Sequence, residues 1–106
     1  MVQKTDKNLR IARKFKKKAE KLVKLDKFIF FGSRVKGTFG RYSDFDMLIV
    51  SKDFHETPWY KRPGRFYTAW KEDYPLEVLC YTPEEFRKKQ KTPGIISEAV
   101  KTGIEI

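Results

Sequence analysis

The strongest constraint on the fold is a six-residue strand that is apolar on both of its faces. Residues Phe45 to Val50 are apolar at every position except Asp46. A half-buried strand alternates apolar and polar residues, because successive side chains point to opposite faces of the sheet. The missing alternation therefore predicts a central strand that is covered on both sides. Such a strand is typical of an α/β protein.

The remaining elements are predicted by hydrophobic spacing and by helix-capping patterns. Ala12, Phe15 and Ala19 recur at helical spacing and predict a helix over residues 5–24. No repeat or linker divides the chain, so one domain over residues 1–106 is expected. We also expect strands over 28–31 and 76–81, a turn and brief helix over 32–37, helices over 65–73, from 82 onward and over 95–101, and a terminal strand over 104–106.

The segment from Ser51 to Pro63 is less clearly patterned. Thr57 followed by Pro58 favours a helix start, with Thr57 as the cap, and Pro63-Gly64 would interrupt that helix. An aromatic-rich stretch begins within this segment and continues beyond it. Most of these aromatic side chains are expected in the core, and the rest would form a base-stacking or partner-binding surface. They are Trp59, Tyr60, Phe66, Tyr67 and Trp70.

The composition allows one small core and favours a polyanionic partner, but it selects no function. The chain has 106 residues, 40% of them hydrophobic, and a net charge of +10. Nucleic acid, nucleotides or an acidic protein would suit that charge, although a solvated basic surface explains the helical lysines equally well. No apolar run is long enough to span a membrane, and the Lys-rich N-terminus does not resemble a signal peptide. The single cysteine cannot form an internal disulfide, so a cytoplasmic protein is the simplest expectation.

Three carboxylates interrupt the apolar strands. Asp44 and Asp46 are two residues apart and therefore point to the same face of one strand. Two like charges at the end of an apolar strand are costly without a cation. Glu77 lies inside the strand over 76–81 and would complete a triad if the two strands are neighbours. Three carboxylates can hold two divalent ions about 4 Å apart, which clamp the attacking and leaving oxygens of a phosphoryl transfer.

A Gly-Ser turn precedes these acids and is suited to phosphate. Gly32 ends a strand and lets the backbone turn sharply and approach a ligand. The backbone N–H groups at the start of the next helix, its dipole and the Ser33 hydroxyl favour phosphate oxygens. Lys36, one turn later, can reach the same phosphates.

Each feature also has a purely structural interpretation. A Gly-Ser pair after a strand is usually only a turn, and an Asp-x-Asp pair is often a surface feature. Glu77 could protect the edge of the sheet from unwanted pairing. The combination is more specific than its parts, and it predicts metal-dependent phosphoryl transfer.

The motif resembles the signature of the DNA polymerase beta-like nucleotidyltransferase superfamily. That signature is an apolar residue, Gly, Gly or Ser, a spacer of about ten residues, and then Asp, apolar, Asp, apolar. Phe31-Gly32-Ser33 and Asp44-Phe45-Asp46-Met47 match it, separated by Arg34 to Ser43. The sequence is most similar to the minimal nucleotidyltransferases of archaea and bacteria, and the resemblance covers nearly the whole chain.

The resemblance implies a polymerase beta-like fold of the α/β (α+β) class, with a small mixed sheet of three to four strands flanked by about four helices. It implies transfer of AMP from ATP to a hydroxyl acceptor, with two Mg²⁺ ions as cofactors and pyrophosphate as the leaving group. Asp44 and Asp46 would ligate both ions. Glu77 would ligate the catalytic ion and help to activate the acceptor hydroxyl.

The resemblance also implies a nucleotide-binding set. Gly32 and Ser33 would hold the terminal phosphates of ATP, and Lys36 and Ser43 would contact phosphate. Three features depart from the family pattern. Glu77 stands where many relatives have Asp, and Lys36 replaces a commoner Arg, which keeps the charge but loses the bidentate fork. Pro63-Gly64 interrupts what is usually a cleaner helix. None of the departures removes a metal ligand.

The family likeness implies a partner as well. Minimal members are commonly encoded with a small helical protein of the HEPN family, an RNase toxin that several of them adenylylate as antitoxins. A toxin–antitoxin role and a homo- or hetero-oligomer are expected here on that basis. Two alternatives stay open: a non-catalytic antitoxin that neutralises a HEPN protein by contact, and an RNA-modifying nucleotidyltransferase whose partner is nucleic acid.

Overall fold

A four-stranded mixed sheet forms the middle layer of the protein, which the computed structural model describes for residues 4–106. The strand order is β3-β2-β1-β4. β2 pairs antiparallel with β1 and parallel with β3, and β4 pairs antiparallel with β1. The sequence-predicted bounds of β2 and β3 and the terminal strand are confirmed. The strands are β1 (Lys27–Phe31), β2 (Phe45–Val50), β3 (Leu76–Tyr81) and β4 (Ile104–Glu105).

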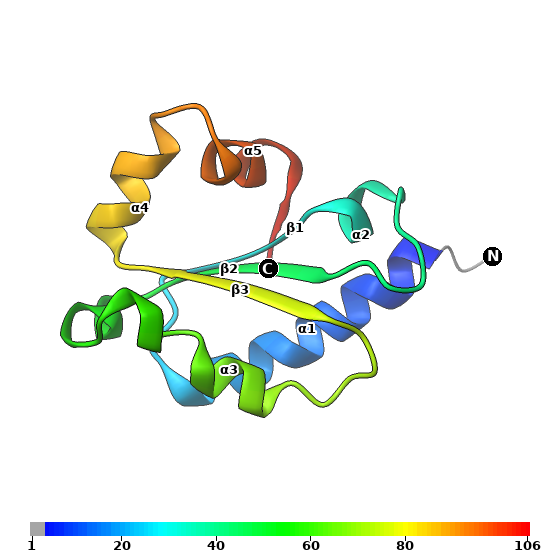
Figure 1. Cartoon of the computed structure of the whole chain (residues 1–106), viewed down its shortest axis with the longest axis horizontal. Helices are drawn as coiled ribbons and strands as arrows, with labels where there is room; N and C mark the ends of the chain where they lie inside the picture. The colour runs from blue at the N-terminus through cyan, green and yellow to red at the C-terminus, as the bar shows by residue number, and fades with distance from the viewer. Residues whose placement is uncertain (1–3) are drawn as a thin grey trace.

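Helices cover both faces of the sheet (Figure 1). One face carries α1 (Lys4–Leu22) and α3 (Gly64–Ala69), and the other carries α4 (Pro83–Gln90) and α5 (Ile95–Thr102). The single turn α2 (Ser33–Lys36) follows β1 directly. Within residues 4–106, no helix is both long enough and apolar enough to cross a membrane.

Two apolar clusters hold these layers together, one on each face of β2. Phe45, Met47 and Ile49 pack toward α1 and α3, whereas Leu48 and Val50 pack toward α4 and α5. All five side chains are at most 1% exposed. Each contributes about 2 kcal/mol by leaving water. The prediction of a strand covered on both sides is confirmed.

The segment between Ser51 and Pro63 forms two short 3-10 helices, Lys52–Glu56 and Trp59–Lys61. The predicted helix start with Thr57 as the cap is wrong, because Thr57 ends the first of these helices and Pro58 is the cap residue of the second. The Ser51 hydroxyl caps the segment by accepting from the Asp53 N–H at 3.1 Å. Buried Phe54 fixes its position under the sheet.

The aromatic stretch is divided between core and surface. Phe66 is fully buried, but Trp59 is 75% exposed, Tyr60 63% and Tyr67 44%. The expectation that most of these side chains are core is therefore wrong. Helix α3 also ends four residues before the predicted limit of residue 73, because Trp70 is extended and donates its indole N–H to the Tyr74 carbonyl at 2.7 Å.

Candidate active site

The three predicted acids meet at one end of the parallel strand pair. Asp46 of β2 lies directly opposite Glu77 of β3, so the condition set by the sequence, that these strands are neighbours, is met. Asp44 precedes β2 by one residue and shares the face of Asp46. One carboxylate oxygen from each residue lies within 4.8 Å of the others. This spacing suits oxygen ligands around hard divalent cations.

The clustered negative charge of these carboxylates favours a bound cation. The pKa of Asp46 is raised to about 6, first by burial and then by the negative charges of Asp44 and Glu77. A carboxylate in such a position is stabilised in its charged form only if positive charge is brought beside it. The oxygen-only donor set fits Mg²⁺ or Mn²⁺ better than a softer metal.

Gly32 is placed beside the acids by the pairing of β1 with β2. Phe31, the last residue of β1, lies opposite Asp46, and Gly32 turns away from the strand with φ of +89°. A side chain at this position would be strained and its Cβ would overlap the Asp46 carboxylate. Only glycine therefore fits between the strand end and the acid cluster.

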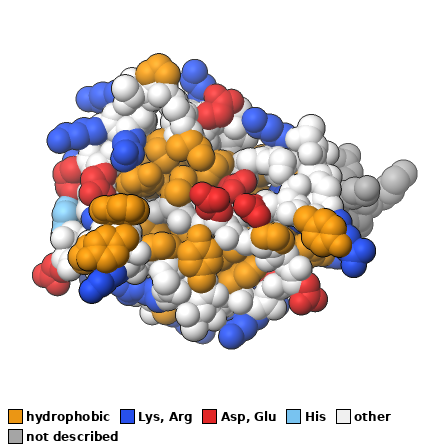
Figure 2. Space-filling model, in the orientation of Figure 1, with side chains coloured by type: hydrophobic (Ala, Val, Ile, Leu, Met, Phe, Trp, Pro, Cys, Tyr) orange, Lys and Arg blue, Asp and Glu red, His pale blue; other side chains and the backbone are white. Residues whose placement is uncertain are grey.

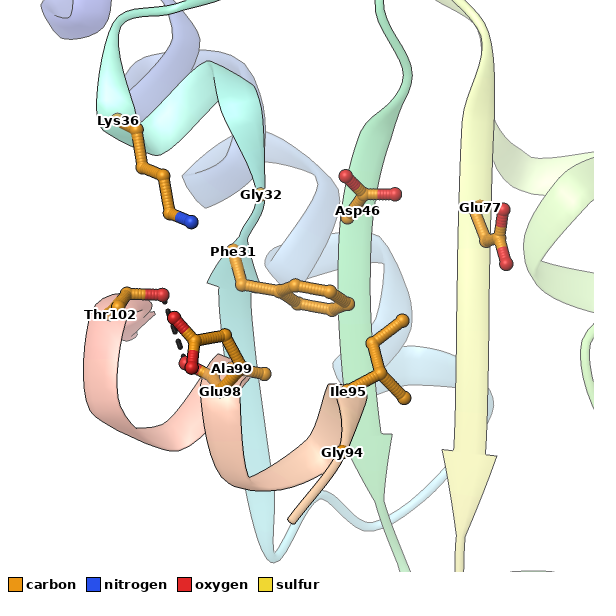
Figure 3. Close-up of a pocket in the computed structure, with 10 residues that line it drawn as sticks. All are labelled: Phe31, Gly32, Lys36, Asp46, Glu77, Gly94, Ile95, Glu98, Ala99 and Thr102. Carbon is orange, nitrogen blue, oxygen red and sulfur yellow. Dashed lines mark hydrogen bonds between the residues drawn. The ribbon is translucent and has the colours of Figure 1, made fainter.

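The predicted phosphate-binding residues differ in how they are placed around this turn. Ser33 begins α2, before the first intrahelical hydrogen bonds, in which Val35 and Lys36 donate to the Gly32 carbonyl at 3.1 and 3.2 Å. The Lys36 side chain extends from α2 across the pocket toward α5 (Figure 3). The Ser43 hydroxyl instead accepts from the Gly40 N–H at 2.9 Å, so its phosphate contact stays a prediction.

A pocket of about 540 Å³ opens beside Asp46 and the Gly32 turn, whereas Ser33, Ser43 and Asp44 are not among its lining residues. Its size is typical of small-ligand sites. Gly32, Lys36, Asp46 and Glu77 lie along one side (Figure 3). Helix α5 forms the opposite wall, which the sequence had not associated with the site. Its lining residues are Gly94, Ile95, Glu98, Ala99 and Thr102. The sequence predicted a helix over residues 95–101, but not that part of this helix would border a ligand site.

Arg34 is a residue of the site region that the sequence did not single out. It is only 3% exposed, and its guanidinium stacks within 4.6 Å of the Phe45 and Tyr74 rings and 5.0 Å from the Phe39 ring. It donates to the carbonyls of the loop 40–43, with the shortest bond to Ser43 at 2.9 Å. Arg34 thereby fixes the backbone that leads into Asp44.

Together, the mixed sheet, the Gly-Ser turn and the acid cluster define a nucleotidyltransferase with the polymerase beta-like fold. The family model for the nucleotidyltransferase domain matches residues 12–106, and the chain belongs to that family. A similar solved structure, from Sulfolobus solfataricus and described as a "putative nucleotidyltransferase", has a TM-score of 0.64 and 18% sequence identity. It aligns over 99% of this chain and 87% of that one. At this identity the likeness concerns the fold alone. No curated protein matches the sequence.

Proposed function

We propose that this protein is a Mg²⁺-dependent nucleotidyltransferase that moves AMP from ATP to a hydroxyl group of a partner protein. The observation that carries the proposal is the convergence of Asp44, Asp46 and Glu77 within 4.8 Å. Asp44 and Asp46 are assigned as ligands of both ions, and Glu77 as a ligand of the catalytic ion. When bound, the two ions would neutralise the phosphates and the developing charge on the attacking and leaving oxygens.

We assign one side of the pocket to the nucleotide and the other to the acceptor. Lys36 and the Gly32-Ser33 turn lie on the β1 side of the acids and are assigned to the triphosphate. Glu77 lies on β3, the strand at the end of the sheet, and is assigned to the acceptor. It would draw the proton from the acceptor hydroxyl. That oxygen forms a bond to the α-phosphorus, and the bond from the α-phosphorus to pyrophosphate breaks.

The partner and the biological role rest on family likeness. We propose that the acceptor is a HEPN-family toxin, that this chain is its antitoxin, and that both act in the cytoplasm. The two chains would form a hetero-oligomer, and residues 1–106 would act as a single nucleotidyltransferase domain. The family match over residues 12–106 supports the reaction class.

The test is transfer of label from ATP carrying ³²P at the α-phosphate, with Mg²⁺ and a co-expressed HEPN protein. Wild-type protein should label the partner, and the Asp44→Asn/Asp46→Asn variant should lose at least about a thousandfold in rate, since it removes both shared ligands. Equal labelling by wild type and variant would contradict the proposal. Repeating the assay with CTP, GTP and UTP tests the choice of AMP.

The competing function is a non-catalytic antitoxin that neutralises its partner by contact. In that case the Asp44→Asn/Asp46→Asn variant would still protect cells from the toxin. An RNA-modifying activity is the other alternative, favoured by the net charge of +10. It would give labelled RNA rather than labelled protein in the same assay.

A further inference from the structure

A groove leads away from the acid cluster along the outer edge of the sheet. The pocket at the acids shares Gly94 and Ile95 with a second concavity, which is also lined by Tyr81 and Lys89. Tyr81 also borders a third concavity. The first hollow shares lining residues with the second, and the second shares Tyr81 with the third; we call the second and third together the edge groove. The other residues of the third hollow are Trp59, Tyr60, Pro63, Val78, Leu79 and Cys80.

One face of β3 connects the acid cluster to the edge groove. Glu77, Leu79 and Tyr81 alternate along β3 and share one face of the strand. Leu79 and Tyr81 pack against the cluster under α4 and α5. The distance from Glu77 to Tyr81 along the strand is about 13 Å, which a few residues of an extended chain can span. Figure 2 shows apolar side chains around the acid cluster on this face.

The far end of the groove carries two unburied aromatic side chains. Trp59 and Tyr60 are 75% and 63% exposed, and their rings contact each other edge to face at 5.9 Å. Large aromatic side chains that lie together in water next to a hollow are characteristic of binding surfaces. Their position on a 3-10 helix over β3 places them beside the groove rather than in the core.

The lining of the groove favours a polypeptide over a nucleic acid. The third hollow contains no Lys or Arg, whereas a nucleic-acid track needs repeated cationic contacts to phosphate. Most basic residues of α1 lie on the other face of the sheet. Lys89 lines the groove, with its Nζ 5.4 Å from the Tyr81 ring centroid, and exposed Lys61 follows the lining residue Tyr60 in sequence. Neither has a salt-bridge partner among residues 4–106.

We propose that the edge groove binds a segment of the acceptor polypeptide and delivers its hydroxyl to Glu77. An apolar side chain of the segment packs against Trp59 and Tyr60, and an acidic side chain pairs with Lys61 or Lys89. The segment is held by side chains rather than added as a strand, because two backbone groups at the edge of β3 are already hydrogen-bonded to side chains. The Tyr67 hydroxyl accepts from the Val78 N–H at 3.2 Å, and Arg62 donates to the Cys80 carbonyl at 3.3 Å. The inference rests on the proposed function, since it requires a protein acceptor.

The test uses a random peptide display library. Wild-type protein is the bait, with counter-selection on the Trp59→Ala/Tyr60→Ala variant, and the most enriched peptide is synthesised with fluorescein for anisotropy. We expect an acidic and apolar peptide that binds the double variant about tenfold more weakly than wild type. Both side chains are exposed, so thermal unfolding of the variant should match wild type. The matched control is Tyr42→Ala, which removes an aromatic that is 80% exposed elsewhere and should leave binding unchanged.

The experiment distinguishes an error in the proposed groove from an error in the proposed reaction. The Asp44→Asn/Asp46→Asn variant should bind the peptide like wild type, because binding does not need transfer. If it does and wild type transfers no AMP to any protein, the groove stands and the proposed reaction is wrong. The groove is overturned if no peptide distinguishes wild type from the Trp59→Ala/Tyr60→Ala variant. It is also overturned, in favour of RNA, if oligoadenylate displaces the peptide and binds through the same aromatic pair.

Discussion

At the scale of single residues, Asp46 makes the site sensitive to pH. Its pKa is raised to about 6 by burial, Asp44 and Glu77, and a metal ion must displace the proton that this carboxyl holds. We expect Mn²⁺ affinity, measured by calorimetry, to weaken as the pH falls below 6, by up to about tenfold per pH unit. The Asp46→Asn variant should bind Mn²⁺ weakly with a flatter pH profile. Equal wild-type affinity at pH 5 and pH 7 would contradict this.

The same residue should affect the stability of the metal-free protein in the opposite sense. The folded state holds the Asp46 proton more tightly than the unfolded chain, whose pKa is near 3.8. This stabilisation is full below pH 4 and is lost as the pH rises to about 6. Because the side chain is only half-buried, we expect on the order of 1 kcal/mol. In urea unfolding with EDTA, wild type should show this extra stability at pH 4 and lack it at pH 7. The Asp46→Asn variant should show no such difference.

Arg34 and Arg62 are both buried arginines. Comparing their variants therefore separates an effect on the position of the metal ligands from an effect on stability alone. Arg62 is bound to Glu85 at 2.7 Å, away from the acids, whereas Arg34 fixes the loop before Asp44. We expect Arg34→Met and Arg62→Met each to cost about 3 kcal/mol of folding free energy. Only Arg34→Met should also weaken Mn²⁺ binding per folded molecule, by about tenfold or more. If both variants bind Mn²⁺ alike, Arg34 has no positioning role.

At the scale of elements, the start of α4 tests whether helix capping and the site are independent. The Thr82 hydroxyl accepts from the Glu85 N–H at 3.2 Å, and the Glu85 carboxylate accepts from the Thr82 N–H at 2.8 Å. Thr82→Ala should lower the free energy of unfolding by about 1 kcal/mol, measured in urea. Mn²⁺ affinity should not change, because α4 contributes no residue to the pocket at the acids.

Elements with strong local signals could be predicted from sequence, and those set by tertiary contacts could not. The apolar runs at Phe45 and Leu76 gave the bounds of β2 and β3, and the Thr82 capping pattern gave the start of α4. The 3-10 helices after Ser51 depend on buried Phe54 and on Arg62, which bonds the Thr57 carbonyl at 2.8 Å. Arg62 is close in sequence but belongs to no recognisable local pattern, and Phe54 is buried only by the core cluster of the folded chain.

The residues of the site also divide into those with a local sequence signal and those that depend on tertiary contacts. The acids and Gly32 could be predicted because a charged residue or a glycine is unexpected in or beside an apolar strand. Arg34 could not, because a basic residue in a short polar turn normally suggests a solvated side chain. Its burial depends on Phe39, Phe45 and Tyr74, which come together only in the folded chain. The α5 wall was missed for the same reason.

At the scale of the whole molecule, the basic helix α1 and the acid cluster lie on opposite faces of the sheet. Exposed basic residues on α1 include Arg10, Arg13, Lys17 and Lys21. Replacing these four with Gln should make the protein elute from heparin at lower salt, because fewer cations contact the polyanion. Nucleotidyl transfer to protein should be unchanged. A parallel loss of transfer would mean that α1 helps to bind the acceptor or the nucleotide.

The pairing of Asp46 with Glu77 has a consequence for how the chain tolerates insertions and deletions. Side chains alternate along a strand, so one residue gained or lost inside β3 would turn Glu77 to the opposite face and separate it from the two aspartates. The connection over residues 51–75 can change in length without this effect, provided that the strands keep their register. Variation in length among related chains should therefore collect in that connection and be excluded from the six residues of each paired strand.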